Sequence, residues 1–179
     1  MSDIPSVDVR VLIAGVGNLL RADDGFGVEV ARQLLACPPI VPGVAITVIE
    51  TGIGGMHLVQ ELLSGYDALI IVDAIQRDAE PGTLFILQPE RVHPHTWSVE
   101  VRRDFFADTH YAEPSHALAL AEGIGALPEQ VAIVGCQVAS TDDLIHGMCP
   151  AVERAVSLAV TQMPGIISSI VTRASVVEA

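Results

Sequence analysis

The chain has 179 residues, a length typical of a single domain with one core. Its 22 acidic and 9 basic residues give a formal charge of −13 at pH 7, which repels phosphate backbones and anionic membrane surfaces. We therefore expect neither nucleic acid nor a membrane as a partner, whereas a cation or a basic peptide would be attracted.

Two further features of the sequence bear on where the protein works. The apolar runs are too short to cross a bilayer and the N-terminal residues lack the hydrophobic region of a signal peptide, so we expect a cytoplasmic protein. We also expect it to be a monomer. The three cysteines, Cys37, Cys136 and Cys149, are odd in number and far apart, which is not the pattern of a disulfide framework or of a Cys-x-x-Cys metal motif. Each is expected to be a small buried apolar residue.

The first half of the chain alternates runs of β-branched and aliphatic residues with segments whose apolar residues recur at helical spacing. The runs at 9–14, 44–49 and 68–72 are predicted strands, and the segments at 28–35 and 56–63 are predicted helices. This order is typical of an α/β fold, here a three-layer α/β/α architecture with a mostly parallel twisted sheet of about five strands. A ligand site is then expected beyond the carboxyl ends of the strands.

The second half completes the predicted sheet and leaves one long connection. The predicted elements are an edge strand, parallel or antiparallel, at 83–87, a strong strand at 131–138, and helices at 116–124 and 151–163. From 88 to 115, three prolines and three histidines interrupt any periodicity, and a connection of this length is usually functional. We treat residues 1–179 as one domain, with a tail at 165–179 that is expected to pack loosely.

The stretch VLIAGVGNLLRADDGFG, residues 11–27, turns at Gly15 and Gly17 between the first predicted strand and the first helix. A glycine turn in this place invites comparison with dinucleotide sites, in which the backbone approaches a pyrophosphate. Here Leu20 stands at the third glycine position, and Asp23 and Asp24 would repel a diphosphate in a poorly screened site. No Gly-Lys-Ser/Thr follows the glycines, so neither kind of nucleotide site is supported.

Asp23 and Asp24 stand where the first helix is expected to begin, and a helix start favours negative charge. One aspartate there can cap the helix by accepting backbone N–H bonds. For Asp23, helix capping and a functional role both stay open. A second aspartate gains less from the helix dipole and adds repulsion. Asp24 is therefore the better candidate for a separate function.

Two more candidates are expected at the same edge of the predicted sheet. The strand LIIV runs directly into Asp73, and His116 begins a helix after Pro114 and Ser115. Two carboxylates that converge in one crevice need a cation or a shared proton. Asp24, Asp73 and His116 together make a ligand set suited to nickel, zinc or iron, although spacing alone does not single this set out.

Three segments together resemble one known family. GVGNLLRADDGFG after the first strand, LIIVDA in the middle and SHALALAE after the long connection are similar to segments of the maturation endopeptidases of nickel-iron hydrogenases, over about residues 11–160. The resemblance implies an endopeptidase that removes a short C-terminal extension from the hydrogenase large-subunit precursor after nickel insertion. It also implies that Asp24, Asp73 and His116 are the catalytic and nickel-sensing residues, and that the nickel comes with the substrate.

The resemblance leaves alternatives open. Many members of the family carry glutamate in place of Asp24, and His93, His95 and His110 of the long connection compete with His116 for the role of imidazole ligand. The same ligands would also suit a metal-dependent hydrolase with its own resident ion, or a non-catalytic nickel chaperone. A cysteine protease is a weaker alternative.

Overall fold

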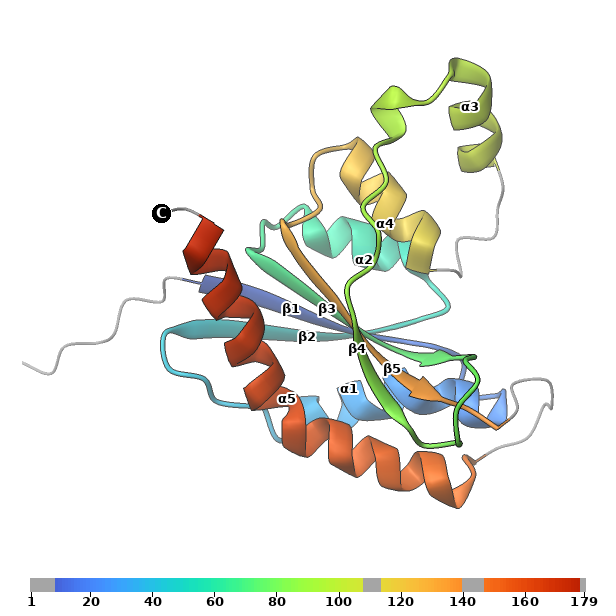
Figure 1. Cartoon of the computed structure of the whole chain (residues 1–179), viewed down its shortest axis with the longest axis vertical. Coiled ribbons are helices and arrows are strands. Elements are labelled where there is room, and N and C mark those ends of the chain that lie inside the picture. The colour runs from blue at the N-terminus through green and yellow to red at the C-terminus, as the bar shows by residue number, and fades with distance from the viewer. Residues whose placement is uncertain (1–8, 108–113, 140–146, 178–179) are drawn as a thin grey trace, which may run out of the picture.

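The computed structural model describes residues 9–107, 114–139 and 147–177. At its centre is a five-stranded sheet in the order β2-β1-β3-β5-β4 (Figure 1). The strands are β1 (Val9–Val16), β2 (Val44–Gly52), β3 (Ala68–Ile75), β4 (Leu84–Leu87) and β5 (Gln130–Gln137). Neighbouring strands pair in parallel except β4, an edge strand that runs antiparallel to β5. The predicted α/β architecture is confirmed.

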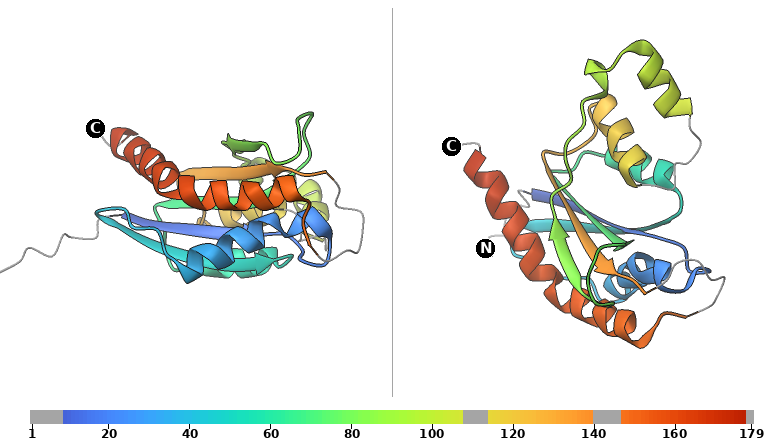
Figure 2. Two further views of the ribbon diagram at one scale, coloured as in Figure 1. Left: turned by 90° about the horizontal axis from the view of Figure 1, so that it is seen from below. Right: turned by 45° about the vertical axis from the view of Figure 1, so that its right-hand side comes forward.

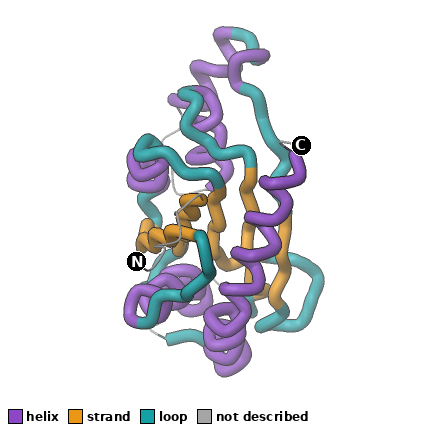
Figure 3. Tube along the Cα trace, turned by 90° about the vertical axis from the view of Figure 1, so that its left-hand side faces the viewer, coloured by secondary structure: helices purple, strands orange, loops and turns teal. Residues whose placement is uncertain are grey.

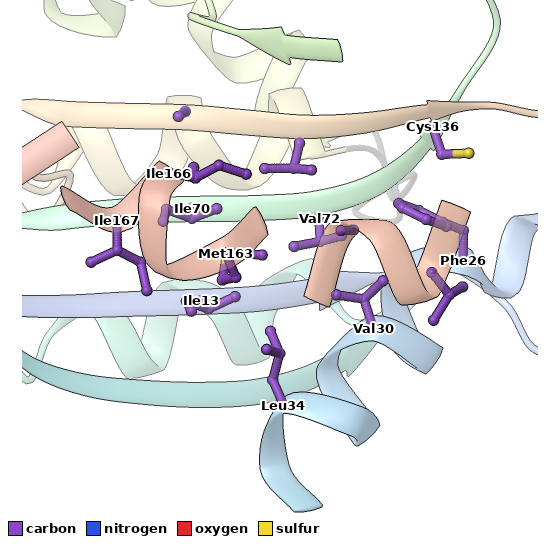
Figure 4. Close-up of a cluster of buried hydrophobic side chains, with 14 of the residues drawn as sticks. Ile13, Phe26, Val30, Leu34, Ile70, Val72, Cys136, Met163, Ile166 and Ile167 are labelled. Atoms are coloured by element: carbon purple, nitrogen blue, oxygen red, sulfur yellow. The ribbon is translucent and has the colours of Figure 1, made fainter. Parts of the chain in front are cut away.

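One face of the sheet is covered by α1 (Phe26–Ala36) and α5 (Pro150–Val177), as Figures 1 and 2 show. Alternate residues of each strand point to this face, because successive side chains of a strand lie on opposite sides. In the close-up of this core, Ile13 of β1 and Ile70 of β3 lie beside Met163 of α5 (Figure 4), and all three side chains are fully buried.

The other face is covered by α2 (Gly55–Leu62) and α4 (Pro114–Gly123), so the sheet lies between two helical layers. Here the intervening residues of the same strands are buried, among them Leu12, Leu69 and Ile71. Because both faces are covered, the central strands are nearly continuous apolar runs, which is why the sequence predicted them well.

Helix α5 is longer than the sequence predicted. It continues through Pro164 and covers most of the tail that was expected to pack loosely, and it runs along one side of the strands in Figure 3. Burial explains this, because Ile166, Ile167 and Ile170 join the core and offset the hydrogen bond that Pro164 removes. The segment Pro150–Thr172 is therefore long and apolar enough to cross a membrane by composition, with a mean hydropathy of 1.5. The expectation that every apolar run is too short to cross a bilayer is therefore not met by length and composition, although Val156, Met163 and Ile167 of this helix are buried in the core.

Replacing Pro164 with alanine should stabilise the protein by about 1–2 kcal/mol, because alanine restores a helical hydrogen bond and removes a steric conflict with the preceding turn. The greater freedom of alanine in the unfolded chain reduces the gain. Urea unfolding of Pro164→Ala measures it, with Ser169→Ala on the exposed side of the same helix as a neutral control. A lower free energy of unfolding for Pro164→Ala would show that the core requires a bend at this proline.

The long connection from 88 to 115 was predicted to lack regular structure, but part of it is helical. It contains a 3₁₀ helix, η2 (Pro94–Thr96), and a helix, α3 (Val99–Ala107), which stands away from the sheet beyond α4 (Figure 1). Helix α3 could not be recognised from the sequence because its apolar residues do not form a stripe that faces the core: Val99 and Val101 are 70% and 55% exposed.

Candidate active site

The two predicted acidic residues lie at the carboxyl edge of the sheet, where the neighbouring strands β1 and β3 end (Figure 1). A short loop leads from β1 into the 3₁₀ helix η1 (Ala22–Gly25), which carries Asp24, and α1 begins immediately after it. Asp73 lies within β3, two residues before the end of the strand. The parallel pairing of β1 with β3 therefore places both residues at one edge, as predicted.

The loop after β1 holds Asp24 with its own backbone. The N–H of Asn18 donates to Oδ2 of Asp24 at 3.0 Å and to the carbonyl oxygen of the same residue at 3.2 Å. Gly17 has a φ of +131°, and a Cβ there would lie 1.9 Å from the Asp24 carbonyl oxygen. Only glycine fits at this position, and Gly17 thereby allows the loop backbone to lie close to Asp24.

The two carboxyl groups interact electrostatically. Burial raises the pKa of Asp73 to about 7, and repulsion by Asp24 adds to this rise. Burial also raises the pKa of Asp24, although the hydrogen bond from Asn18 and the nearby Arg21 oppose it. Carboxyl groups that resist ionisation in this way are favourable sites for a divalent cation, which removes the repulsion and takes the place of a proton.

Asp23 does not cap the first helix, so the capping interpretation was wrong. It is 2% exposed, and its two carboxylate oxygens accept backbone N–H bonds from Ala139 at 2.9 Å and from Cys149 at 2.7 Å. These partners lie at the end of β5 and just before α5. Asp23 therefore fastens η1 to both of these elements, a role that its place in the sequence did not indicate.

His116 lies in the first turn of α4, and its surroundings are aromatic. The ring of Phe105 from α3 stacks on the imidazole, with centroids 4.3 Å apart and planes inclined by 16°. Nδ1 of His116 is buried and has no hydrogen-bond partner within the part of the chain that the structure describes. In the same described part, no three histidine, cysteine, aspartate or glutamate side chains lie close enough together to hold a metal ion. The three-residue ligand set therefore stays a prediction.

The competing histidines lie elsewhere or outside the described residues. Nδ1 of His93 is 3.1 Å from Oε1 of Glu122, and the rings of His93 and His95 contact each other with centroids 5.6 Å apart. Both residues are exposed. His110 falls outside the residues that the structure describes. Among the described histidines, His116 is thus the one with a buried ring nitrogen that lacks a partner.

The cysteines give little support to a cysteine protease. Burial raises the pKa of the Cys136 thiol to about 12, and the nearby charge of Asp23 contributes, so this thiol would rarely ionise to the nucleophilic thiolate. Cys149 is half-buried, whereas Cys37 is exposed just after the end of α1, contrary to the prediction that it is buried.

A shallow hollow of about 410 Å³ lies beside the glycine turns that follow β1 and β2. Asn18, Thr51 and Gly52 are among its lining residues, and the Thr51 hydroxyl donates to the Gly15 carbonyl at 2.9 Å, which joins the two turns. Cavities of about 490 and 800 Å³ lie against the start of β5, and neither aspartate lines them. Asp24 and Asp73 line none of these three hollows, and both side chains are partly buried.

Comparison with solved structures defines the class of protein. The chain matches the hydrogenase maturating endopeptidase HybD from E. coli with a TM-score of 0.68 at 28% identity, over 89% of this chain and 93% of that chain. The fold is thus that of a hydrogenase maturating endopeptidase. The sequence model of the hydrogenase maturation proteases matches residues 29–165, a segment that contains Asp73 and His116 and begins just after Asp24. The chain belongs to the hydrogenase maturation protease family.

Curated relatives agree with this assignment. The hydrogenase expression/formation protein HupD of Rhizobium leguminosarum is 30% identical over 149 residues, which cover 79% of this chain and 69% of HupD. The corresponding protein HoxM of Cupriavidus necator is 32% identical over 150 residues, covering 82% of this chain and 70% of HoxM.

Proposed function

We propose that this protein removes the C-terminal extension of a nickel-iron hydrogenase large-subunit precursor after nickel insertion, and that it recognises the precursor by its bound nickel. The observation that carries the proposal is the pair of interacting carboxyl groups, Asp24 and Asp73, at the carboxyl edge of the sheet in an endopeptidase of this family. Such a pair favours a divalent cation, and a precursor loaded with nickel would present one.

The donor set fits nickel. Carboxylate oxygens of Asp24 and Asp73 and an imidazole nitrogen of His116 are ligands that Ni²⁺ accepts, and three protein ligands leave positions for the precursor's own ligands. Nδ1 of His116 is buried and has no hydrogen-bond partner in the described part of the chain, so through this atom the imidazole is not held by another protein group. Nickel held between enzyme and precursor could also polarise the scissile carbonyl group.

The acidic charge of the chain supports two further parts of the proposal. A formal charge of −13 disfavours self-association and contact with anionic membranes, in keeping with a monomer that acts in the cytoplasm. It would also attract a cationic metal centre or a basic segment of the precursor.

The test is a processing assay with purified large-subunit precursor, with and without nickel, in which mass spectrometry detects the shortened product. Asp24→Ala and His116→Ala should each lower the processing rate of nickel-loaded precursor at least about tenfold, the size of effect typical for a lost ligand or positioning group. His57→Ala and His95→Ala, which remove exposed imidazoles, should process at the wild-type rate.

Each alternative gives a different result. Normal processing by Asp24→Ala or His116→Ala would remove that residue from the site. Stoichiometric, tightly held zinc or iron in the purified protein would favour a hydrolase with a resident ion. Nickel transfer without a shortened large subunit would indicate a chaperone.

A further inference from the structure

In the described residues, His116 lacks the hydrogen bond that usually orients a metal-binding histidine. In most such sites the second ring nitrogen donates a hydrogen bond to a carboxylate or a backbone carbonyl, and this bond fixes the plane of the ring. Here Nδ1 is buried without a partner in the described residues. Because the χ2 torsion of histidine is broad, another contact has to set the ring plane.

The structure offers one such contact, the ring of Phe105. It lies nearly parallel to the imidazole at a centroid distance of 4.3 Å, and Trp97 packs its edge against the same phenylalanine at 4.9 Å and 67°. Parallel and edge-on arrangements at these distances are the favoured geometries of aromatic pairs. A row of three rings thus runs from the end of η2 across α3 to the first turn of α4.

This contact also joins α3 to the candidate site. The helix stands away from the sheet and leaves Val99 and Val101 exposed, so it adds little to the main core. In the described residues, the contacts of α3 with the rest of the protein include the stacking of Phe105 on His116, a candidate site residue. The position of α3 and the orientation of His116 are therefore linked through one side chain.

We propose that Phe105 is a positioning residue, whose stacked ring holds the imidazole of His116 in the plane required to meet the nickel of the precursor. The proposal rests on the proposed function, because it assigns Phe105 a task at the same site. Phe105 itself does not contact substrate. It acts through His116, and Trp97 contacts the same phenylalanine ring.

The test uses three variants. Phe105→Leu keeps an apolar side chain but removes the aromatic face, Phe105→Tyr keeps that face, and Val101→Ala is a matched control on the exposed part of the same helix. Phe105→Leu should lower kcat/KM for nickel-loaded precursor roughly three- to tenfold, the change that corresponds to one aromatic pair. Phe105→Tyr and Val101→Ala should keep the wild-type value.

A second readout does not depend on processing. In the free protein, the ring protons of His116 should show an upfield NMR shift from the Phe105 ring current, which Phe105→Leu removes and Phe105→Tyr retains. Thermal unfolding of each variant confirms that it is folded. The proposal is overturned if Phe105→Leu processes at the wild-type rate, or if its rate falls while the His116 signals stay unchanged. Normal processing by His116→Ala would instead overturn the assignment of His116 in the proposed function.

Discussion

Asp73→Asn should abolish precursor processing and, at the same time, stabilise the free protein at pH 8 by about 2–4 kcal/mol. Processing is lost because a neutral amide is a weaker ligand for a divalent cation than a carboxylate. Stability is gained because burial and the charge of Asp24 raise the pKa of Asp73 from 3.8 to about 7. A rise of this size corresponds to about 4 kcal/mol at most.

The same pKa determines the pH dependence of stability. Below about pH 4 the Asp73 carboxyl group is protonated in both the folded and the unfolded chain, and its contribution to stability is fully present. Between pH 4 and 7 the unfolded chain releases the proton while the folded protein keeps it, so the free energy of unfolding falls as the pH rises. Above about pH 7 both forms are ionised, and the loss of stability is complete.

Urea unfolding of the wild type and Asp73→Asn from pH 4 to pH 8 measures this effect. The decline with rising pH should be smaller in the variant, whereas Asp78→Asn, at an exposed aspartate, should follow the wild-type curve. Equal pH dependence in the wild type and Asp73→Asn would show that Asp73 ionises normally in the folded protein.

Asp23→Ala should destabilise the protein by about 2–4 kcal/mol, because it leaves two backbone N–H groups without their charged acceptor. Those groups belong to Ala139 and Cys149, which lie 116 and 126 residues away in the sequence. Asp23→Asn should cost less than Asp23→Ala, since its amide oxygen still accepts one of the two bonds while its NH₂ group faces the other donor.

The comparison variant is Asp104→Ala, which removes an exposed aspartate 3.7 Å from Arg103 and should change stability by less than about 0.5 kcal/mol. Denaturant titration at one pH gives all three free energies of unfolding. If Asp23→Ala and Asp104→Ala prove equally stable, the two bonds to Asp23 contribute nothing to the folded state.

Much of the fold could be predicted because its signals are local. The central strands are buried on both faces and read as apolar runs, and the helices that cover them repeat their apolar residues at helical spacing. Asp24 and Asp73 could be found for the same reason, since the carboxyl ends of parallel strands meet at one edge. The extension of α5 through Pro164 could not be predicted, because proline disfavours a helix locally. Only the burial of Ile166 and Ile167 outweighs this unfavourable effect.

By itself, the sequence determined the parallel sheet, the glycine turns after β1 and β2, and the acidic carboxyl edge, since strand and turn preferences act over a few residues. Only the tertiary structure decided what the side chains at that edge do. Asp23 is a buried anchor because its partners lie just after β5 and just before α5, and Asp24 and Asp73 interact because β1 pairs with β3. Contacts between different elements of the fold leave no periodic pattern in the sequence. The stacking of Phe105 in α3 on His116 in α4 is another such contact.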